Sequence, residues 1–168
     1  MKKVLFVCTG NTCRSPMAMS IFNYAVSLKA AGPDFMASSA GLSVYGDEPA
    51  SSNAITAMKE LAGIDLTGHR AHMLSRDDVD EATLILTMSA GQKNYIRSLF
   101  PGAYHKVFTI KEYAYDVPEQ NNKSGVKAAP AFSPDIADPY GGSLAVYKLC
   151  AQELAQAVEK VVEKLKKS

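Results

Sequence analysis

The sequence predicts an α/β protein built as a three-layer αβα sandwich, in which helices cover both faces of a parallel sheet. Short apolar runs typical of buried strands alternate along the chain with segments whose apolar residues recur at helical spacing. Such alternation indicates parallel strands joined by helical crossovers. A length of 168 residues, with 47% hydrophobic and 21% charged residues, suits one globular domain, residues 1–168, with a single core.

Four segments are predicted to form the strands of this sheet. Each is short, and all but residues 35–40 are rich in Val, Leu, Ile or Phe. The predicted strands span residues 3–8, 35–40, 83–88 and 106–110. Polar Thr9-Gly10-Asn11 ends the first strand, and Gly41 closes the second.

Five segments are predicted to be helices, spanning residues 15–31, 51–62, 77–81, 89–100 and 143–166. Ser51 or Ser52 caps the second, Gly63 ends it, and Pro101 stops the fourth. Apolar residues at helical spacing define the face that a helix should bury. The faces expected for the first, second and last helices are Met17, Ile21, Tyr24, Ala25 and Leu28; Ile55, Met58 and Leu61; and Leu144, Tyr147, Leu154, Val158, Val161 and Leu165.

The composition indicates neither nucleic acid nor a membrane as partner. The net charge is only +1, so there is no global positive field. The apolar run that follows Lys2-Lys3 is too short for a signal peptide. Nothing else approaches the roughly 20 apolar residues of a membrane span. We therefore expect a cytoplasmic protein.

The cysteines cannot form a disulfide framework, because three thiols, Cys8, Cys13 and Cys150, always leave one unpaired. No Cys/His cluster predicts zinc, and His69 with His72 would make at most a helical metal pair without a third ligand. We expect no metal. The thiols are therefore either inert core residues or reactive ones.

The residues after the first strand are the predicted ligand site, since parallel sheets bind ligands beyond the carboxyl ends of their strands. Cys8 ends that strand, and Arg14 with Ser15 opens the next helix. This geometry directs backbone N–H groups and the positive helix end at one point, which makes an anion site. Arg14 can add a bidentate fork to two phosphate oxygens. The predicted phosphate-binding residues are Thr9, Gly10, Asn11, Thr12, Cys13, Arg14 and Ser15.

Cys8 should ionise easily in such a field, because cations and helix N-termini stabilise a thiolate. Ser15 can donate a hydrogen bond to the sulfur, Gly10 lets the backbone curl around a ligand, and Asn11 can hold the loop or take a left-handed turn. Cys8 would then attack phosphorus in line and form a cysteinyl-phosphate that water hydrolyses. Alternatively, Cys8 is an inert strand cysteine before a tight turn. The complete Cys-x5-Arg-Ser string after the first strand favours the reactive cysteine.

These motifs resemble the low-molecular-weight protein-tyrosine phosphatase family along nearly the whole chain. The matching stretches are residues 8–16, Ser39-Ala40-Gly41, Gly68-His69-Arg70-Ala71 and Asp138-Pro139-Tyr140. The resemblance implies a four-stranded parallel sheet of order 2-1-3-4, with Cys8 as nucleophile and Arg14 as phosphate clamp. It also implies phosphorylated proteins as substrates, phosphate-like anions as product or inhibitor, and no cofactor.

A phosphatase of this type must protonate its leaving group and then activate water, and one carboxylate can do both. The resemblance assigns this role to Asp138, just before the last helix. Asp116 and Asp135 are rivals that lack its Asp-Pro-aromatic context, and without the Cys8 loop the Asp138 stretch would be only a surface turn. Tyr140 is expected to form one wall of the substrate crevice. Tyr45 is either the opposite wall or a plain exposed loop tyrosine.

Thr12 bears on which phosphorylated residue is the substrate. Tyrosine phosphatases of the family usually carry Ile or Leu at this position, whereas Thr12 and the segment 106–113 resemble the bacterial protein-arginine phosphatase branch. An aliphatic side chain favours an aromatic ring, while a hydroxyl can hydrogen-bond a guanidinium or orient water. We therefore predict phosphoarginine, with phosphotyrosine as the alternative. Thr12 as a neutral β-branched replacement stays open.

Three further features of the sequence lie outside the catalytic assignments made above. His69 is expected to support the loop from behind. Cys13 either packs in the loop or forms a reversible Cys8–Cys13 disulfide that protects the nucleophile from over-oxidation. The weakly structured segment 114–137 is longer than the family usually has, and either extends the substrate surface or is a mobile insertion.

Two other classes of protein share part of the pattern. Thioredoxin-coupled arsenate reductases have the same fold and loop but need a further pair of redox cysteines, and only Cys150 is left here. A catalytically inactive phosphoprotein-binding module would keep its function after Cys8→Ser. The enzyme would lose hydrolysis and keep substrate binding.

Overall fold

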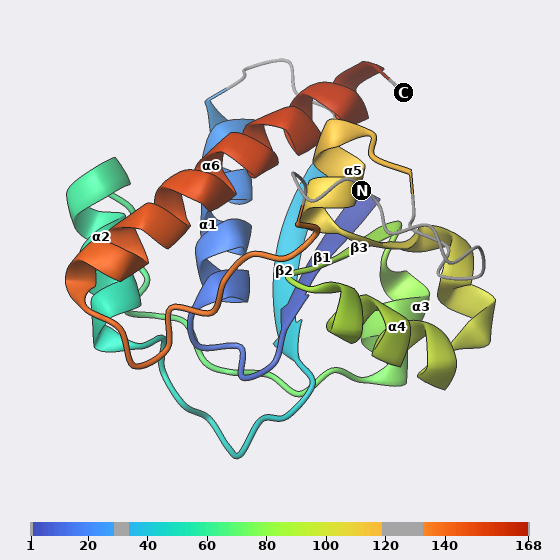
Figure 1. Cartoon of the computed structure of the whole chain (residues 1–168), viewed down its shortest axis with the longest axis horizontal. Coiled ribbons are helices and arrows are strands. Elements are labelled where there is room, and N and C mark those ends of the chain that lie inside the picture. The colour runs from blue at the N-terminus through green and yellow to red at the C-terminus, as the bar shows by residue number, and fades with distance from the viewer. Residues whose placement is uncertain (1, 29–33, 119–132, 168) are drawn as a thin grey trace.

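The structure is a computed structural model that describes residues 2–28, 34–118 and 133–167. At its centre lies a four-stranded, all-parallel sheet of order β2-β1-β3-β4, with helices on both faces (Figure 1). This arrangement confirms the predicted fold class and strand order. The elements are β1 Lys2–Cys8, α1 Arg14–Ser27, β2 Phe35–Gly41, α2 Ser52–Ala62, α3 Arg76–Glu81, β3 Leu84–Thr87, α4 Ala90–Leu99, the 3-10 helix η1 Pro101–Lys106, β4 Val107–Thr109, α5 Ile110–Tyr115 and α6 Leu144–Lys167.

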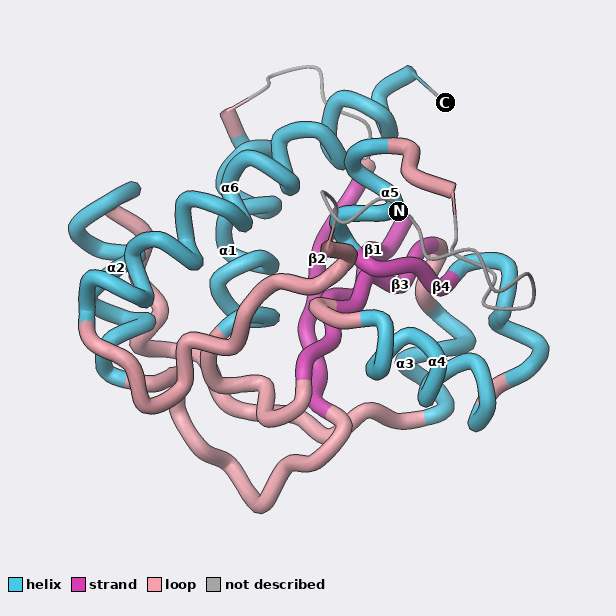
Figure 2. The backbone as a smooth tube through the Cα atoms, in the orientation of Figure 1, coloured by secondary structure: helices cyan, strands magenta, loops and turns pink. Residues whose placement is uncertain are grey.

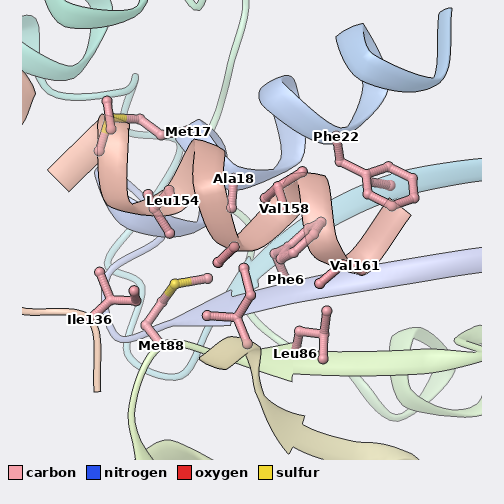
Figure 3. Close-up of a cluster of buried hydrophobic side chains, with 14 of the residues drawn as sticks. Phe6, Met17, Ala18, Phe22, Leu86, Met88, Ile136, Leu154, Val158 and Val161 are labelled. Atoms are coloured by element: carbon pink, nitrogen blue, oxygen red, sulfur yellow. The ribbon is translucent and has the colours of Figure 1, made fainter. Parts of the chain in front are cut away.

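Strand β1 contributes side chains to both cores, because consecutive residues of a strand point to opposite faces. Phe6 packs edge-on against Phe22 of α1, in the cluster that also holds Val158 of α6 (Figure 3). Leu5 and Val7 belong to the second cluster, on the α3 and α4 side. A strand buried on both faces is apolar throughout, which explains its continuous hydrophobic run. The loop after β1 therefore starts from an inner strand, which lies between β2 and β3 (Figure 2).

Helix α1 buries only part of the face expected, with Ile21 and Ala25 partly buried against the core. Met17 is buried as predicted, but its partners are Ala18 and Phe22, whereas Tyr24 and Leu28 are exposed. The reason is that α1 is covered by both α6 and β2, so the buried face is set by two neighbours. Residues 29–31 of the predicted helix lie outside the described residues.

Helix α2 is capped as the sequence predicts. The Ser51 side chain accepts a hydrogen bond from the Ala54 N–H, and Gly63 ends the helix in the left-handed conformation with φ 64°. Of its expected face, Met58 is buried and Ile55 packs against the core, whereas Leu61 is exposed; Ala54 and Ala57 complete the buried face. Small alanines let α2 lie close against α6. This contact forms only when the chain folds, so the spacing of apolar residues within α2 does not predict it.

Helix α5 was not predicted. The strand expected at 106–110 is shorter, and the chain turns into the helix at Ile110. The Thr109 hydroxyl caps this helix by accepting a hydrogen bond from the Glu112 N–H at 3.1 Å. Glu112 in turn pairs with the buried Lys93 of α4 at 2.9 Å. The Thr-x-x-Glu spacing is the available sequence signal, hidden by the β-branched run before it. Of the segment 114–137, residues 119–132 lie outside the described residues.

Candidate active site

Asn11 organises the loop that joins β1 to α1. It is fully buried and adopts the left-handed conformation, with φ 56°. Its side-chain nitrogen donates to the hydroxyls of Ser15 at 2.8 Å and Ser39 at 3.0 Å. Its side-chain oxygen accepts from the backbone N–H of His72 at 2.8 Å. One side chain thus ties the loop to α1, to β2 and to the segment before α3, and both roles considered for Asn11 are realised.

The thiol of Cys8 lies buried within this loop and contacts two donors. The backbone N–H of Asn11 donates to the sulfur at 3.2 Å, and the Ser15 hydroxyl oxygen lies 2.9 Å from it. Because that hydroxyl already accepts from the Asn11 side chain, its own hydrogen is available to the sulfur. Both donors can hydrogen-bond the sulfur during a nucleophilic attack. The arrangement can therefore hold a thiolate nucleophile.

His69 lies behind the loop, where its Nε2 is 2.7 Å from the carbonyl oxygen of Asn11. A carbonyl only accepts, so Nε2 carries the hydrogen. Burial lowers the pKa of His69, which favours the neutral ring in this position. A neutral His69 thus holds the Asn11 carbonyl without placing another positive charge beside the loop.

Gly41 allows β2 to approach the loop closely. A Cβ atom at this position would lie 2.8 Å from the carbonyl oxygen of Thr9 and 3.0 Å from the Cβ of Asn11. Because these atoms belong to the loop itself, any side chain at residue 41 would displace it. The Ser39-Ala40-Gly41 stretch therefore positions the loop as well as closing a strand.

Gln92 of α4 is a loop-supporting residue that the sequence analysis missed. Its amide nitrogen donates to the Thr9 hydroxyl at 3.1 Å. Its amide oxygen accepts from the backbone N–H groups of Met88 at 2.9 Å and Ser89 at 3.1 Å. The sequence signal was the capping box of Ser89 with Gln92, which the structure realises.

Arg14 joins the loop to the segment that carries Asp138. Its Nη1 donates to the carbonyl oxygen of Ile136 at 2.8 Å, and its Nη2 lies 3.7 Å from the Asp138 carboxylate. Ile136 is itself buried in the core beside Met88, whose carbonyl accepts its N–H at 2.7 Å (Figure 3). Asp138 is therefore brought over the loop by a buried anchor two residues before it, and its own side chain is 55% exposed.

The two rival carboxylates are engaged elsewhere. Asp135 accepts from the N–H of Ala90 at 2.8 Å, at the start of α4. Asp116 ends α5 in the left-handed conformation, with φ 52°, and forms an ion pair with Lys164 of α6. Neither lines the pocket above Cys8, whereas Asp138 does.

A pocket of about 280 Å³ opens above the loop. Cys8 and Arg14 form its buried floor, while Tyr45 and Tyr140 stand at its mouth with 89% and 79% of their surface exposed. Asn11 and Ser15 lie behind the floor. The lining residues are Cys8, Thr9, Gly10, Thr12, Cys13, Arg14, Ser43, Val44, Tyr45, Glu48, Asp138 and Tyr140. Ser43, Val44 and Glu48 were missed from the sequence, because their loop has no recognisable motif.

Cys13 and Cys150 occupy different environments, and all three thiols of the chain are free. Cys13 lines the pocket, and its sulfur lies 3.3 Å from the Tyr147 hydroxyl and 3.5 Å from the Ser51 hydroxyl. Burial raises the pKa of Tyr147 to about 12, so that hydroxyl keeps its hydrogen at neutral pH. Burial likewise raises the pKa of Cys150 to about 12, which leaves this thiol protonated and unreactive.

Within the described ranges, no group of three His, Cys, Asp or Glu residues could hold a metal ion. His69 and His72 do not form the helical pair considered above, since neither lies on a helix and His72 contacts Asp78 at 2.7 Å. Among the same residues, no helix has both the length and the apolar character needed to cross a bilayer.

Fold and pocket together define the class of protein. A parallel αβα sandwich with a thiol, an arginine and a carboxylate around the loop after its first strand is the framework of a small cysteine-dependent phosphatase. A family model described as low molecular weight phosphotyrosine protein phosphatase matches residues 3–168. The chain belongs to this family.

Individual relatives carry two kinds of name. A protein-arginine-phosphatase of Geobacillus stearothermophilus is 36% identical over 97% of this chain and 95% of its own length. A solved low molecular weight protein tyrosine phosphatase from T. tengcongensis is 41% identical, with a TM-score of 0.83 over 98% of this chain and 99% of that one. The structure of a YwlE arginine phosphatase mutant with a phosphorylated active-site serine is 31% identical, with a TM-score of 0.84 over 99% of this chain and 97% of that one.

Proposed function

We propose that this protein hydrolyses phosphorylated side chains of proteins through a cysteinyl-phosphate on Cys8, and that phosphoarginine is its preferred substrate. The observation that carries the proposal is the buried Cys8 sulfur, with donors at 2.9 and 3.2 Å, in a pocket that Asp138 also lines. The relative named protein-arginine-phosphatase supports the choice of substrate.

In the first step, the Cys8 thiolate attacks phosphorus while the bond to the leaving nitrogen or oxygen breaks. Arg14 and the backbone N–H groups at the start of α1 bind the phosphoryl oxygens, since these helical amides have no partner within the helix. Arg14 has five N–H donors and uses one on Ile136, so others can face the pocket. Asp138, in its protonated form, gives a proton to the departing group.

In the second step, the Asp138 carboxylate takes a proton from water, and the oxygen attacks phosphorus. The sulfur–phosphorus bond breaks, which releases inorganic phosphate and restores the thiolate. Ser15 steadies the thiolate on departure, because its hydroxyl lies 2.9 Å from the sulfur. Inorganic phosphate is then a product and an inhibitor, and similar anions are inhibitors of the same pocket. No cofactor enters the reaction.

The preference for phosphoarginine is proposed to depend on Thr12, which lines the pocket. We expect Thr12→Ile to lower the ratio of kcat/KM for phosphoarginine over phosphotyrosine by about tenfold, because the hydroxyl that can pair with the guanidinium is lost. The assay compares both phosphorylated residues in one protein sequence, before and after the change.

Thr12→Val is the matched control for size, because valine has the shape of threonine without its hydroxyl. It should lower the same ratio almost as far as Thr12→Ile does. A ratio unchanged in both variants would remove Thr12 as the determinant. Turnover of phosphotyrosine alone by the unmodified protein would leave the phosphatase and remove the arginine preference.

Cys13 is proposed as a redox partner of Cys8, because both thiols are free and line one pocket. Mild peroxide should oxidise Cys8 to a sulfenic acid, which condenses with the Cys13 thiol to a disulfide and releases water. Mass spectrometry should detect the Cys8–Cys13 peptide link, and Cys13→Ser should yield sulfinic acid at Cys8 instead. Sulfinic acid at Cys8 of the unmodified protein, without the link, would contradict the proposal.

We further infer that residues 1–168 act as one phosphatase domain and work in the cytoplasm. The match of the family model to residues 3–168 supports the first inference. Three free thiols suit the reducing conditions of that compartment and support the second.

A further inference from the structure

The charges that line the pocket differ between its floor and its mouth. Among the lining residues that the structure describes, Arg14 is the one cation, and it lies at the buried floor. Two carboxylates, Asp138 and Glu48, line the same pocket, and Glu48 is exposed at the mouth. The pocket therefore suits a ligand with a negative end that faces inward and a positive group behind it.

The loop that bears Glu48 is fastened to the phosphate-binding loop at both ends. The N–H of Ser43 donates to the carbonyl oxygen of Thr9 at 2.9 Å, and the N–H of Ser51 donates to that of Thr12 at 2.9 Å. The carbonyl oxygen of Glu48 itself accepts from the N–H of Ala71 at 2.7 Å. The backbone of residue 48 therefore has a defined position relative to the floor, although the residue is exposed.

The Glu48 carboxylate is available to a ligand. Within the ranges that the structure describes, no hydrogen bond or ion pair engages its oxygens, unlike Asp78, Glu81 and Glu112, which have basic partners. A carboxylate held at the mouth of a phosphate pocket repels a phosphate dianion in the absence of a compensating cation. The Glu48 carboxylate at the mouth therefore disfavours binding of a phosphorylated substrate with a neutral leaving group and favours binding of one with a cationic leaving group.

We propose that Glu48 is a specificity-determining residue that selects phosphoryl groups attached to a cation, namely the guanidinium of phosphoarginine. This inference rests on the proposed phosphatase function of the same pocket. With the phosphoryl group on the floor, the guanidinium of phosphoarginine lies directly behind it, toward the mouth. There the planar N–H fork can donate to the carboxylate of Glu48. Phosphotyrosine presents an uncharged ring at the same depth and gains nothing from that carboxylate.

The test compares Glu48→Gln with Asp47→Asn in the full chain. Both changes remove one negative charge from the same exposed loop, but only residue 48 lines the pocket. Exposed substitutions of this kind have little effect on folding. The substrates are two peptides of one sequence that carry phosphoarginine or phosphotyrosine at the same position, and kcat/KM is measured for each at low ionic strength.

Glu48→Gln should lower the ratio of kcat/KM for phosphoarginine over phosphotyrosine by about fivefold, as expected for one partly exposed charge pair. Asp47→Asn should change this ratio by less than about 1.5-fold. Added salt should lower the ratio of the unmodified protein toward that of Glu48→Gln, since screening weakens an exposed pair. These three results together support the proposal.

Several results would overturn it. The ratio could stay unchanged in Glu48→Gln, or Asp47→Asn could shift it equally, which would indicate the general charge of the loop. Turnover of phosphotyrosine but not of phosphoarginine by the unmodified protein would reject the role of Glu48 and keep the phosphatase. Turnover of neither peptide would reject the proposed function itself, so the two failures are distinguishable.

Discussion

Replacing Cys8 by serine is expected to lower the rate of phosphate release by about 10⁴-fold or more, because a serine hydroxyl is far less ionised than a thiol and attacks phosphorus slowly. The loop should keep its shape, since the Asn11 N–H and the Ser15 hydroxyl that now contact sulfur can bond an oxygen. Binding of inorganic phosphate, measured by calorimetry, should therefore persist while turnover of phosphoprotein vanishes.

Cys150→Ser provides the matched control for Cys8→Ser. This thiol lies in α6, outside the pocket, and its burial raises its pKa to about 12, so its loss should leave turnover nearly unchanged. If Cys8→Ser retained phosphate release, the cysteinyl-phosphate mechanism would be rejected. If it retained the biological effect of the protein without turnover, the inactive phosphoprotein-binding module would be the better description.

Replacing Asp138 by asparagine is expected to lower kcat by about 10²- to 10³-fold on substrates with basic leaving groups, because the proton donor is lost. The loss should be smaller with para-nitrophenyl phosphate, whose leaving group departs without a proton. This dependence on the leaving group is the diagnostic, and it is obtained by measuring kcat for a series of aryl phosphates of increasing leaving-group pKa.

Asp135→Asn is the control for Asp138→Asn. Asparagine keeps an oxygen that can accept from the N–H of Ala90, so the segment should stay in place and kcat should change little. An equal loss of kcat in both variants would indicate that the segment had moved. An equal loss for Asp138→Asn on every leaving group would show that Asp138 does not act as the acid.

The sequence was sufficient to predict those parts of the molecule whose structure depends on residues adjacent in the chain. The four strands follow from short apolar runs, and the loop after β1 follows from Cys8, Arg14 and the turn residues between them. Helix α5 was missed although its Thr109 cap is local, because an apolar β-branched run masked the cap. The buried faces of α1 and α2 were partly wrong for another reason, since each depends on which elements cover the helix.

The prediction that Cys8 is the centre of an anion-binding loop needs only the sequence, because strand, loop and helix are consecutive. Only the tertiary structure decided what surrounds that loop. It brought Asp138 within 3.7 Å of Arg14 through the buried anchor of Ile136, and it placed Gln92 under Thr9 and Glu48 at the mouth. These residues come from elements far apart in the chain. Their contacts exist because a parallel sheet gathers the ends of its strands at one edge, where no local pattern records which side chains meet.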